Sequence, residues 1–538
     1  MVDEDLTIQQ MSEDSDLHNT ISRNIVVTML STVLYLVTRL FIPPIILSYV
    51  SLAEYGVWSY CFIILGYISL SIFGITNVYI RYGSVYYANN EVDNINRLLS
   101  TGIISVLIMC AAIIPFFVIL LPYLFSLLHM SPNLFSVAFW LILGTTLIFM
   151  VDLSFGAFGH LLQSMQRIAY ERAVWTITYL VETGCIIFFL TLGMGIYSLL
   201  YAYFIRTALA ILLYALACYR LIPGFSIGLR YFDRKILKVF IRFGGIVQLS
   251  GFVGITNRAM ERLMAGFFIG AEATALYEVG EKLPTTAQNL PGSINGVLFP
   301  ATAHLHAKNR QAKIVDIYLK GSRIINMISG MLMGFMTAFA APIITCWLGF
   351  DEKYQIAAVI LAFFTWAYQA DILTGPATAI YRSVNEPQRE LWYGLWQLGL
   401  VITAAAIGFA LFGFTYMVIN VSVSTMMVLA ALIYIFLCNR FLKIDQLSYW
   451  KKVLLPGIVP YAFGYLTYAL TFFLYPVFSA DRWYILLFLI INLGIYSLMT
   501  FTCIYFGMCT KEERQVFKKQ LFYTLKEVSR LKTTKKQP

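Results

Sequence analysis

The sequence has few charged residues for its length. Of its 538 residues, 12% are charged and 59% are hydrophobic, and the mean hydropathy is +0.74. Soluble domains carry about 25% charged residues, so a chain of soluble domains is excluded. Apolar runs of about 20 residues recur instead, which is the length that an α-helix needs to cross a bilayer. The chain is therefore predicted to be an all-α polytopic membrane protein.

Motifs of soluble chemistry are also missing. The sequence has no Gly-Lys-Ser phosphate loop, nucleophile elbow or zinc-binding helix, so neither an enzyme nor a self-sufficient ATP-driven pump is predicted. Its eight cysteines lie mostly in apolar stretches, without disulfide or metal-ligand spacing. No cofactor or metal is therefore predicted. The polar, acidic start lacks a basic segment followed by a cleavage site, so no removable signal peptide is predicted.

Basic residues are distributed unevenly between the loops. When each long apolar run is taken as a helix, about fourteen transmembrane helices are predicted. One side of the membrane then holds the basic 220–242 and 440–452 loops and the tail after Lys511, whereas the other holds only Lys353 and Arg482. By the positive-inside rule both termini are cytoplasmic. The net charge of +10 is thus a topology signal, and no nucleic-acid partner is expected.

A long sequence interval recurs and indicates duplication. Asp152 and Asp371 lie in apolar runs, and each is followed four residues later by a glycine, Gly156 or Gly375. Other pairs share this interval: Ser164 with Ser383, Glu171 with Glu390, and Gly102 with Gly321. Because each copy would hold an even number of helices, the two copies are predicted to be parallel repeats of about six helices.

The predicted organisation follows from this repeat and from the charged loops. It comprises a cytoplasmic N-terminal tail (1–22), an N-lobe (23–222), a basic cytoplasmic linker (223–241), a C-lobe (242–443), a C-terminal helix pair (444–510) and a basic tail (511–538). In that tail apolar and basic residues alternate at helical spacing. This pattern favours an amphipathic helix on the cytoplasmic leaflet, and a solvated end is the alternative.

Five cations lie within predicted spans: Arg39, Arg206, Arg258, Arg262 and Lys282. A charge at mid-bilayer costs about 2.5–3.5 kcal/mol, so such residues face a bundle interior or a wet cavity. Guanidinium groups suit phosphate oxygens, so these residues are predicted to bind an anionic substrate such as a pyrophosphate head group. The alternative is internal pairing, because acids lie at helical contact spacing from Arg258, Arg262 and Lys282.

Acidic residues in the spans have two interpretations. Asp152, Asp371, Glu182 and Glu261 are predicted to serve gating or ion coupling, with H⁺ or Na⁺ as the coupled ion. For Asp152 and Asp371 a salt bridge to loop arginines such as Arg167 and Arg382 is favoured. Aromatic residues such as Tyr55, Trp58 and Tyr60 are candidates to line a cavity and stack on sugar rings, with ordinary packing as the alternative. These interpretations are left open by the sequence.

Two short segments carry a family resemblance. Leu52-Ala-Glu-Tyr55-Gly-Val-Trp58 follows the first predicted helix, and Ala275-Leu-Tyr277-Glu-Val-Gly-Glu-Lys-Leu283 begins the eighth, which Pro300 closes. Together with the helix pattern over nearly all of residues 20–510, they resemble the O-antigen-type polysaccharide flippases. These belong to the multidrug/oligosaccharidyl-lipid/polysaccharide exporter superfamily.

The resemblance implies a flippase for a polyprenyl-pyrophosphate-linked oligosaccharide, such as an O-antigen, capsule or exopolysaccharide repeat unit. Two six-helix lobes would move it from the cytoplasmic to the periplasmic leaflet by alternating access around a cationic cavity. The implied location is the bacterial inner membrane. The implied partners are the lipid-linked glycan, membrane lipids, a glycan polymerase and glycosyltransferases. The alternatives are a cation-coupled drug or metabolite exporter of the same superfamily and a non-transporting scaffold for glycan-synthesis enzymes.

Overall fold

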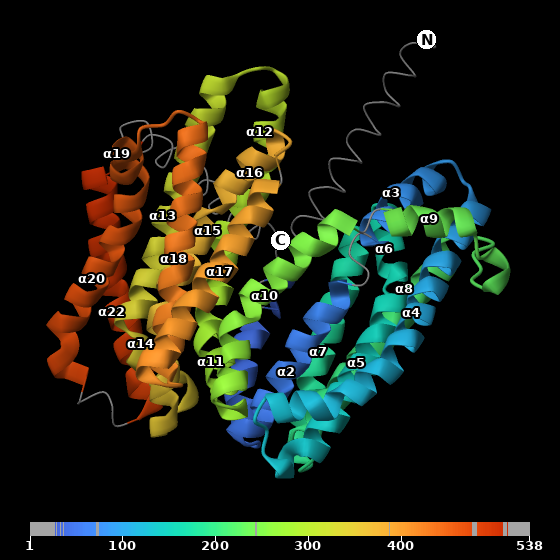
Figure 1. Ribbon diagram of the computed structural model, residues 1–538, viewed down its shortest axis with the longest axis horizontal. Coiled ribbons are helices and arrows are strands. Elements are labelled where there is room, and N and C mark those ends of the chain that lie inside the picture. The colour runs from blue at the N-terminus through green and yellow to red at the C-terminus, as the bar shows by residue number, and fades with distance from the viewer. Residues whose placement is uncertain are drawn as a thin grey trace, which may run out of the picture. The chain divides into compact units, whose positions relative to one another are not determined.

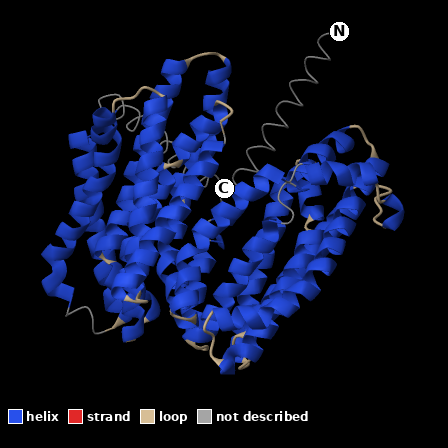
Figure 2. Ribbon diagram, in the orientation of Figure 1, coloured by secondary structure: helices blue, strands red, loops and turns tan. Residues whose placement is uncertain are grey.

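The computed structural model contains only helices and their connections in its described part. It describes residues 37–70, 75–242, 245–386, 388–475 and 481–508, together with residues 27, 30–32, 34, 35 and 514. Figure 2 shows no strand among them, which confirms the all-α prediction. The predicted N-terminal tail and, apart from residue 514, the predicted C-terminal tail lie outside the described residues.

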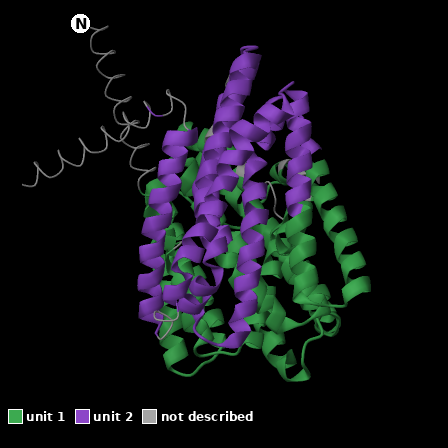
Figure 3. Cartoon of the chain, turned by 90° about the vertical axis from the view of Figure 1, so that its left-hand side faces the viewer, with its two compact units in different colours: residues 1–283, 390–426 green, residues 284–389, 427–538 purple. Residues whose placement is uncertain are grey.

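The chain divides into two compact units, which Figure 3 distinguishes by colour. Unit 1 comprises Met1–Leu283 and Glu390–Met426, and unit 2 comprises Pro284–Arg389 and Met427–Pro538. The division into repeats at 23–222 and 242–443 concerns the sequence and stays a prediction.

The helices are labelled in Figure 1. Unit 1 contains a first helix (Leu30–Leu47), α2 (Leu52–Ser69), α3 (Ile75–Ala88), α4 (Val92–Leu127), α5 (Phe135–Phe155), α6 (Ala157–Ser164), α7 (Ile168–Thr191), α8 (Tyr197–Leu221), α9 (Arg234–Arg242), α10 (Gly245–Phe268) and most of α17 (Gln388–Phe412). Unit 2 contains α12 (Asn289–Ala307), α13 (Gln311–Ala338), α14 (Ala340–Leu348), α15 (Gln355–Leu373), α16 (Gly375–Ser383), α19 (Gln446–Tyr449), α20 (Leu455–Thr471) and α22 (Arg482–Thr502). Both units include parts of α11 (Ala271–Ala287) and α18 (Tyr416–Phe441).

Eleven helices of the described part are long and apolar enough to cross a membrane, or twelve if α13 and α14, bent by 74°, form one span. The predicted count of fourteen exceeds this number because α10 and α11 do not qualify. The middle of α10 carries Arg258, Glu261 and Arg262, and α11 has only 17 residues. Each of these two helices carries several charged residues, which in α11 are Glu272, Glu278, Glu281 and Lys282. The chain is therefore a multi-pass membrane protein with two polar helices.

The repeated aspartates lie one turn before a helix break. In unit 1, α5 ends and α6 begins at Gly156, whose N–H donates to the Asp152 carbonyl at 2.7 Å. In unit 2, α15 ends at Leu373, two residues before Gly375, and the Thr374 N–H donates to the Asp371 carbonyl at 3.0 Å. The sequence predicted a helix over 134–156 without the following α6, and an uninterrupted helix over 355–380. The Asp-x-x-x-Gly pattern is therefore part of a break in the backbone.

Helix ends also recur at the interval of the predicted repeat. Asn90 (φ 58°) and Asn309 (φ 53°) follow α3 and α12, and Gln166 (φ 60°) and Asn385 (φ 62°) follow α6 and α16. A residue in the left-handed region commonly ends a helix, and asparagine tolerates it better than most side chains. This recurrence supports a duplicated unit.

The start of α2 explains the Glu-Tyr-Gly segment that carries the family resemblance. Ser51 and Glu54 form a capping box: the Glu54 N–H donates to Ser51 Oγ at 3.2 Å, and the Ser51 N–H donates to Glu54 Oε2 at 2.9 Å. A Cβ on Gly56 would collide with the Ala271 carbonyl oxygen, so α2 and α11 approach at backbone distance. The Tyr55 side chain, which lies between Glu54 and Gly56 in the sequence, is buried. The segment thus begins a helix and brings it against α11.

The predicted basic linker is held against α4. Asn96 donates through Nδ2 to the Gly224 carbonyl at 3.2 Å and accepts through Oδ1 from the Ser226 N–H at 3.0 Å. Farther along, the Asp233 N–H donates to Thr101 Oγ1 at 2.9 Å, directly before α9. Polar side chains of a long helix therefore order this connection.

Candidate functional site

A cavity of about 200 Å³ lies within unit 1 and is lined by charged and aromatic side chains. Its polar lining comes from four helices: Arg39 from the first helix, Ser59 from α2, Glu182 from α7, and Glu278 and Lys282 from α11. Tyr35, Tyr55, Trp58 and Tyr179 add aromatic surface. The predicted cavity-lining role thus holds for Tyr55 and Trp58, whereas Tyr60 is not among the lining residues and accepts a hydrogen bond from Thr274 of α11 at 2.9 Å.

Glu182 joins two of the predicted substrate-binding arginines. Its Oε2 lies 3.6 Å from Arg39 Nη2 and 4.0 Å from Arg206 Nε. Arg206 also reaches Asp152 on α5, with 3.6 Å between Nη2 and Oδ2. The Glu182 side chain is only 6% exposed, so it is the buried centre of this group. We call Arg39, Asp152, Glu182 and Arg206 the N-lobe ion network.

Aromatic rings hold both guanidinium groups of this network. Arg39 lies 5.3 Å from the ring centres of Tyr35 and Tyr179. Arg206 lies 4.7 Å from the Tyr179 ring and 4.9 Å from the Tyr203 ring. A planar guanidinium stacks on such rings and still offers its N–H groups at the edge, which an ammonium group does not do. Tyr179 therefore orders both cations.

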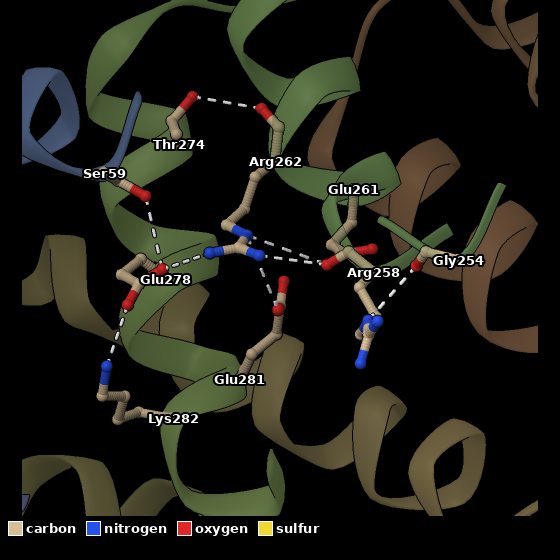
Figure 4. A network of polar contacts seen from close by, with 9 residues as sticks. All are labelled: Ser59, Gly254, Arg258, Glu261, Arg262, Thr274, Glu278, Glu281 and Lys282. Carbon is tan, nitrogen blue, oxygen red and sulfur yellow. Dashed lines mark hydrogen bonds and ion pairs between the residues drawn. The ribbon is translucent and has the colours of Figure 1, made fainter. Parts of the chain in front are cut away.

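A second network joins α10 and α11 (Figure 4). Glu278 accepts hydrogen bonds from Arg262 Nη1 at 2.5 Å and from Lys282 Nζ at 3.0 Å. Ser59 Oγ donates to the same carboxylate at 3.3 Å. Glu261 and Glu281 lie 3.9 and 4.0 Å from Arg262 Nε, and both are almost fully buried. We call this group the α10–α11 network.

The predicted substrate-binding cations do not form one exposed cluster. Arg39, Arg206, Arg262 and Lys282 each contact a carboxylate, so the internal pairing that the sequence left open is present. Arg258 differs: it is exposed, and its Nε donates to the Gly254 carbonyl of its own helix at 3.2 Å. Whether any of these residues binds a substrate stays a prediction.

The expected partner of Asp152 needs correction, whereas the expected pairing of Asp371 with Arg382 stays a prediction. Asp152 pairs with Arg206 of α8, a residue within a span, and not with the loop residue Arg167, which lies at the surface beside Arg220 in another pocket. Asp371 lies in unit 2, where it lines a polar pocket of about 500 Å³ together with amide side chains such as Gln288 and Asn295. The two aspartates therefore match in sequence but differ in surroundings.

Sequence reasoning did not select Tyr179, Ser59 or Glu281 as site residues. One signal was available for Tyr179, because it precedes Glu182 by three residues and so shares its helix face. Glu281 also gave a signal, because it is an acid within a predicted span and was considered there as a pairing partner. Ser59 gave none, since its role depends on a contact between helices.

The fold and the charged cavity define a polytopic membrane protein with ion pairs inside its helical bundle. A sequence profile described as "Polysaccharide biosynthesis protein" matches residues 21–306, which is more than half of the chain. The protein belongs to this family and is a transporter, not an enzyme. No curated protein sequence matched the chain significantly.

Solved structures share this fold. The lipid II flippase MurJ in an inward closed conformation is 14% identical, with a TM-score of 0.64 over 90% of this chain and 98% of that one. A multidrug resistance MATE family transporter of the MOP superfamily in an inward-facing conformation is 16% identical, with a TM-score of 0.62 over 78% and 98%. A MOP superfamily transporter from Pyrococcus furiosus, whose binding pocket is described as having reverse polarity, gives a TM-score of 0.53 at 16% identity, over 79% and 95%. At these identities the likeness concerns the fold.

Proposed function

We propose that the protein is a flippase for a polyprenyl-pyrophosphate-linked oligosaccharide, such as an O-antigen, capsule or exopolysaccharide repeat unit. The cavity of unit 1 carries this proposal, because Arg39 and Lys282 both line it, together with Glu182 and Glu278. Membership of the polysaccharide biosynthesis family favours a glycan substrate. The fold shared with a lipid II flippase favours a lipid-linked one. The proposed direction is from the cytoplasmic to the periplasmic leaflet, by alternating access.

The paired state of the cations is compatible with this proposal. An unpaired arginine in a bundle interior would leave an uncompensated charge, which costs about 3–5 kcal/mol. A resident carboxylate removes this cost while the site is empty. A pyrophosphate provides anionic oxygens for the same N–H donors, so it can replace a carboxylate as their partner. The proposed substrate contacts are Arg39, Arg206, Arg262 and Lys282, with Arg258 at the surface of α10.

The test is leaflet transfer in proteoliposomes that contain the full-length protein. A fluorescent polyprenyl-pyrophosphate disaccharide is incorporated, and a membrane-impermeant quencher reports the fraction in the outer leaflet. We expect Arg39→Ala and Arg206→Ala to reduce the transfer rate at least tenfold. Arg230→Ala is the matched control, because Arg230 lies in the exposed linker and contacts only neighbours such as Tyr231, at 2.9 Å. Wild-type rates in both Arg39→Ala and Arg206→Ala would refute the proposed cargo site.

A cation-coupled drug or metabolite exporter is the second candidate function. Carboxylates favour it: Asp152, Glu182, Glu261, Glu278 and Glu281 outnumber the four cations that they contact. Glu182→Gln and Asp152→Asn would then abolish resistance to a cationic drug in a sensitive host. Leaflet transfer that depends on the arginines, without any drug resistance, would support the flippase.

Ion coupling and location complete the proposal. Asp152, Glu182 and Glu261 are the proposed sites for H⁺ or Na⁺ coupling in unit 1, and Asp371 is the one in unit 2. We place the protein in the bacterial inner membrane, with both termini in the cytoplasm. Membrane lipids, a glycan polymerase and glycosyltransferases are the proposed partners. Imposing a pH or sodium gradient across the proteoliposomes would identify the coupled ion.

A further inference from the structure

Glu278 lines the cavity and accepts hydrogen bonds from three side chains. Its Oε2 accepts from Arg262 Nη1 and Ser59 Oγ, and its Oε1 accepts from Lys282 Nζ (Figure 4). These donors come from α10, α2 and α11 and converge on one carboxylate. Glu278 and Lys282 both line the cavity, so this contact is within reach of a ligand there.

A guanidinium, an ammonium and a hydroxyl group together form a binding site for an anionic oxygen group. Arginine offers directed N–H groups to phosphate oxygens, and lysine adds a point charge. The Glu278 carboxylate therefore stands where a phosphate group of the cargo would be held. The Glu278 carboxylate and a phosphate group both offer anionic oxygens to these donors.

We propose that Glu278 is a resident counter-ion that the pyrophosphate of the cargo displaces from Arg262, Lys282 and Ser59. This inference rests on the proposed function and adds a selectivity step to it. A carboxylate on the same helix as Lys282 is always present at the site, so a free anion must compete with it. The lipid-linked cargo gains binding energy from its sugar and lipid parts as well. Small anions such as inorganic pyrophosphate are therefore excluded, and the cargo is not.

The surroundings allow this exchange. Arg262 lies within 4.0 Å of Glu261 and Glu281 as well as Glu278, so it keeps anionic neighbours when Glu278 leaves. The Glu278 side chain is 18% exposed, whereas those of Glu261 and Glu281 are 2% and 5% exposed. Glu278 is thus the carboxylate of the α10–α11 network that a ligand can reach and replace.

The test is the affinity of the purified, full-length protein for inorganic pyrophosphate, measured by isothermal titration calorimetry. In Glu278→Gln the competing charge is absent and the donors remain. We expect its Kd to fall at least tenfold below that of the wild type, which corresponds to about 1.4 kcal/mol. The matched control is Glu272→Gln, an exposed acid at the start of the same helix, which should bind like the wild type.

An unchanged Kd in Glu278→Gln would overturn the inference, as would an equal gain in Glu272→Gln. If Glu278→Gln does not fold, Glu278→Asp replaces it, because the shorter side chain keeps the charge but draws it away from Lys282. A Kd of Glu278→Asp that lies between the wild-type value and the value expected for Glu278→Gln supports the counter-ion proposal. A Kd equal to that of the wild type overturns it.

The two proposals fail separately. If leaflet transfer requires Arg39 and Arg206 but Glu278→Gln does not bind pyrophosphate more tightly, only the counter-ion proposal is refuted. If Glu278→Gln binds pyrophosphate more tightly but the wild type transfers no lipid-linked sugar, the flippase proposal is refuted and the anion-binding site is still supported.

Discussion

Glu182 should be the residue on which the stability of the N-lobe ion network depends most. Its carboxylate lies 3.6 Å from Arg39 and 4.0 Å from Arg206. At an effective dielectric constant of about 20, each contact contributes about 4–5 kcal/mol of attraction, which the desolvation of the charges largely offsets. Removing one member of such a buried pair costs about 3–5 kcal/mol, because the other charge stays buried without compensation.

We expect Glu182→Gln to lower the free energy of unfolding by about 3 kcal/mol. The lower end of the range applies because Arg206 keeps Asp152 at 3.6 Å and the Arg39 side chain is 25% exposed. Arg39→Met should also destabilise the protein, since Glu182 then keeps only Arg206. The double variant removes both charges, so it should cost less than the two single changes added together by at least about 1–2 kcal/mol.

The assay is a double-mutant cycle, with unfolding in mixed micelles followed by circular dichroism during titration with sodium dodecyl sulfate. The matched control cycle uses Arg97 and Asp233, which lie 3.8 Å apart at side-chain exposures of 52% and 25%. Water screens this pair, so its coupling should stay below about 1 kcal/mol. A coupling between Arg39 and Glu182 no larger than that of the control pair would refute the reasoning.

Two further changes test the packing of the site. Gly56→Ala should greatly reduce the amount of folded protein in the membrane, because the new Cβ would collide with the Ala271 backbone. The control is Gly184→Ala, which has open space around it and should be recovered like the wild type. Equal recovery of the two variants would contradict the close approach of α2 and α11. Tyr179→Leu should lower the free energy of unfolding by about 1–2 kcal/mol and reduce leaflet transfer, because two guanidinium groups lose a ring, while Tyr179→Phe keeps the ring and should behave like the wild type. Equal transfer in the two tyrosine variants would show that the ring does not order the cations.

Membrane insertion, helical structure and the presence of buried charge could all be predicted from the sequence. Long apolar runs have one stable solution in lipid, where every backbone N–H and carbonyl group must bond within its own helix. The same reasoning identified Arg39, Arg206 and Glu182 as charges that need an interior position. It overestimated the number of apolar spans, because α10 and α11 are too polar or too short to qualify alone.

Helix breaks were only partly visible in advance. Gly375-Pro376 follows the break after α15, where proline has no N–H to donate and glycine adds freedom. The break at Gly156 has no proline, so the repeated interval was its only sign. The sequence predicted a repeat with two matching aspartates but did not predict that both precede a break.

The sequence by itself determined what kind of molecule this is: a multi-pass helical membrane protein with cations and acids inside its spans. It did so because hydropathy and charge act locally, along one helix at a time. Only the tertiary structure decided which charges are partners. Arg39 meets Glu182, Asp152 meets Arg206, and Arg262 meets Glu278, each from a different helix. Coulomb attraction depends on distance in space, and interhelical distances are set by packing, such as the backbone contact at Gly56. Four of the five cations that the sequence placed in spans are thus paired with carboxylates in the fold, and two of them, Arg39 and Lys282, line one cavity.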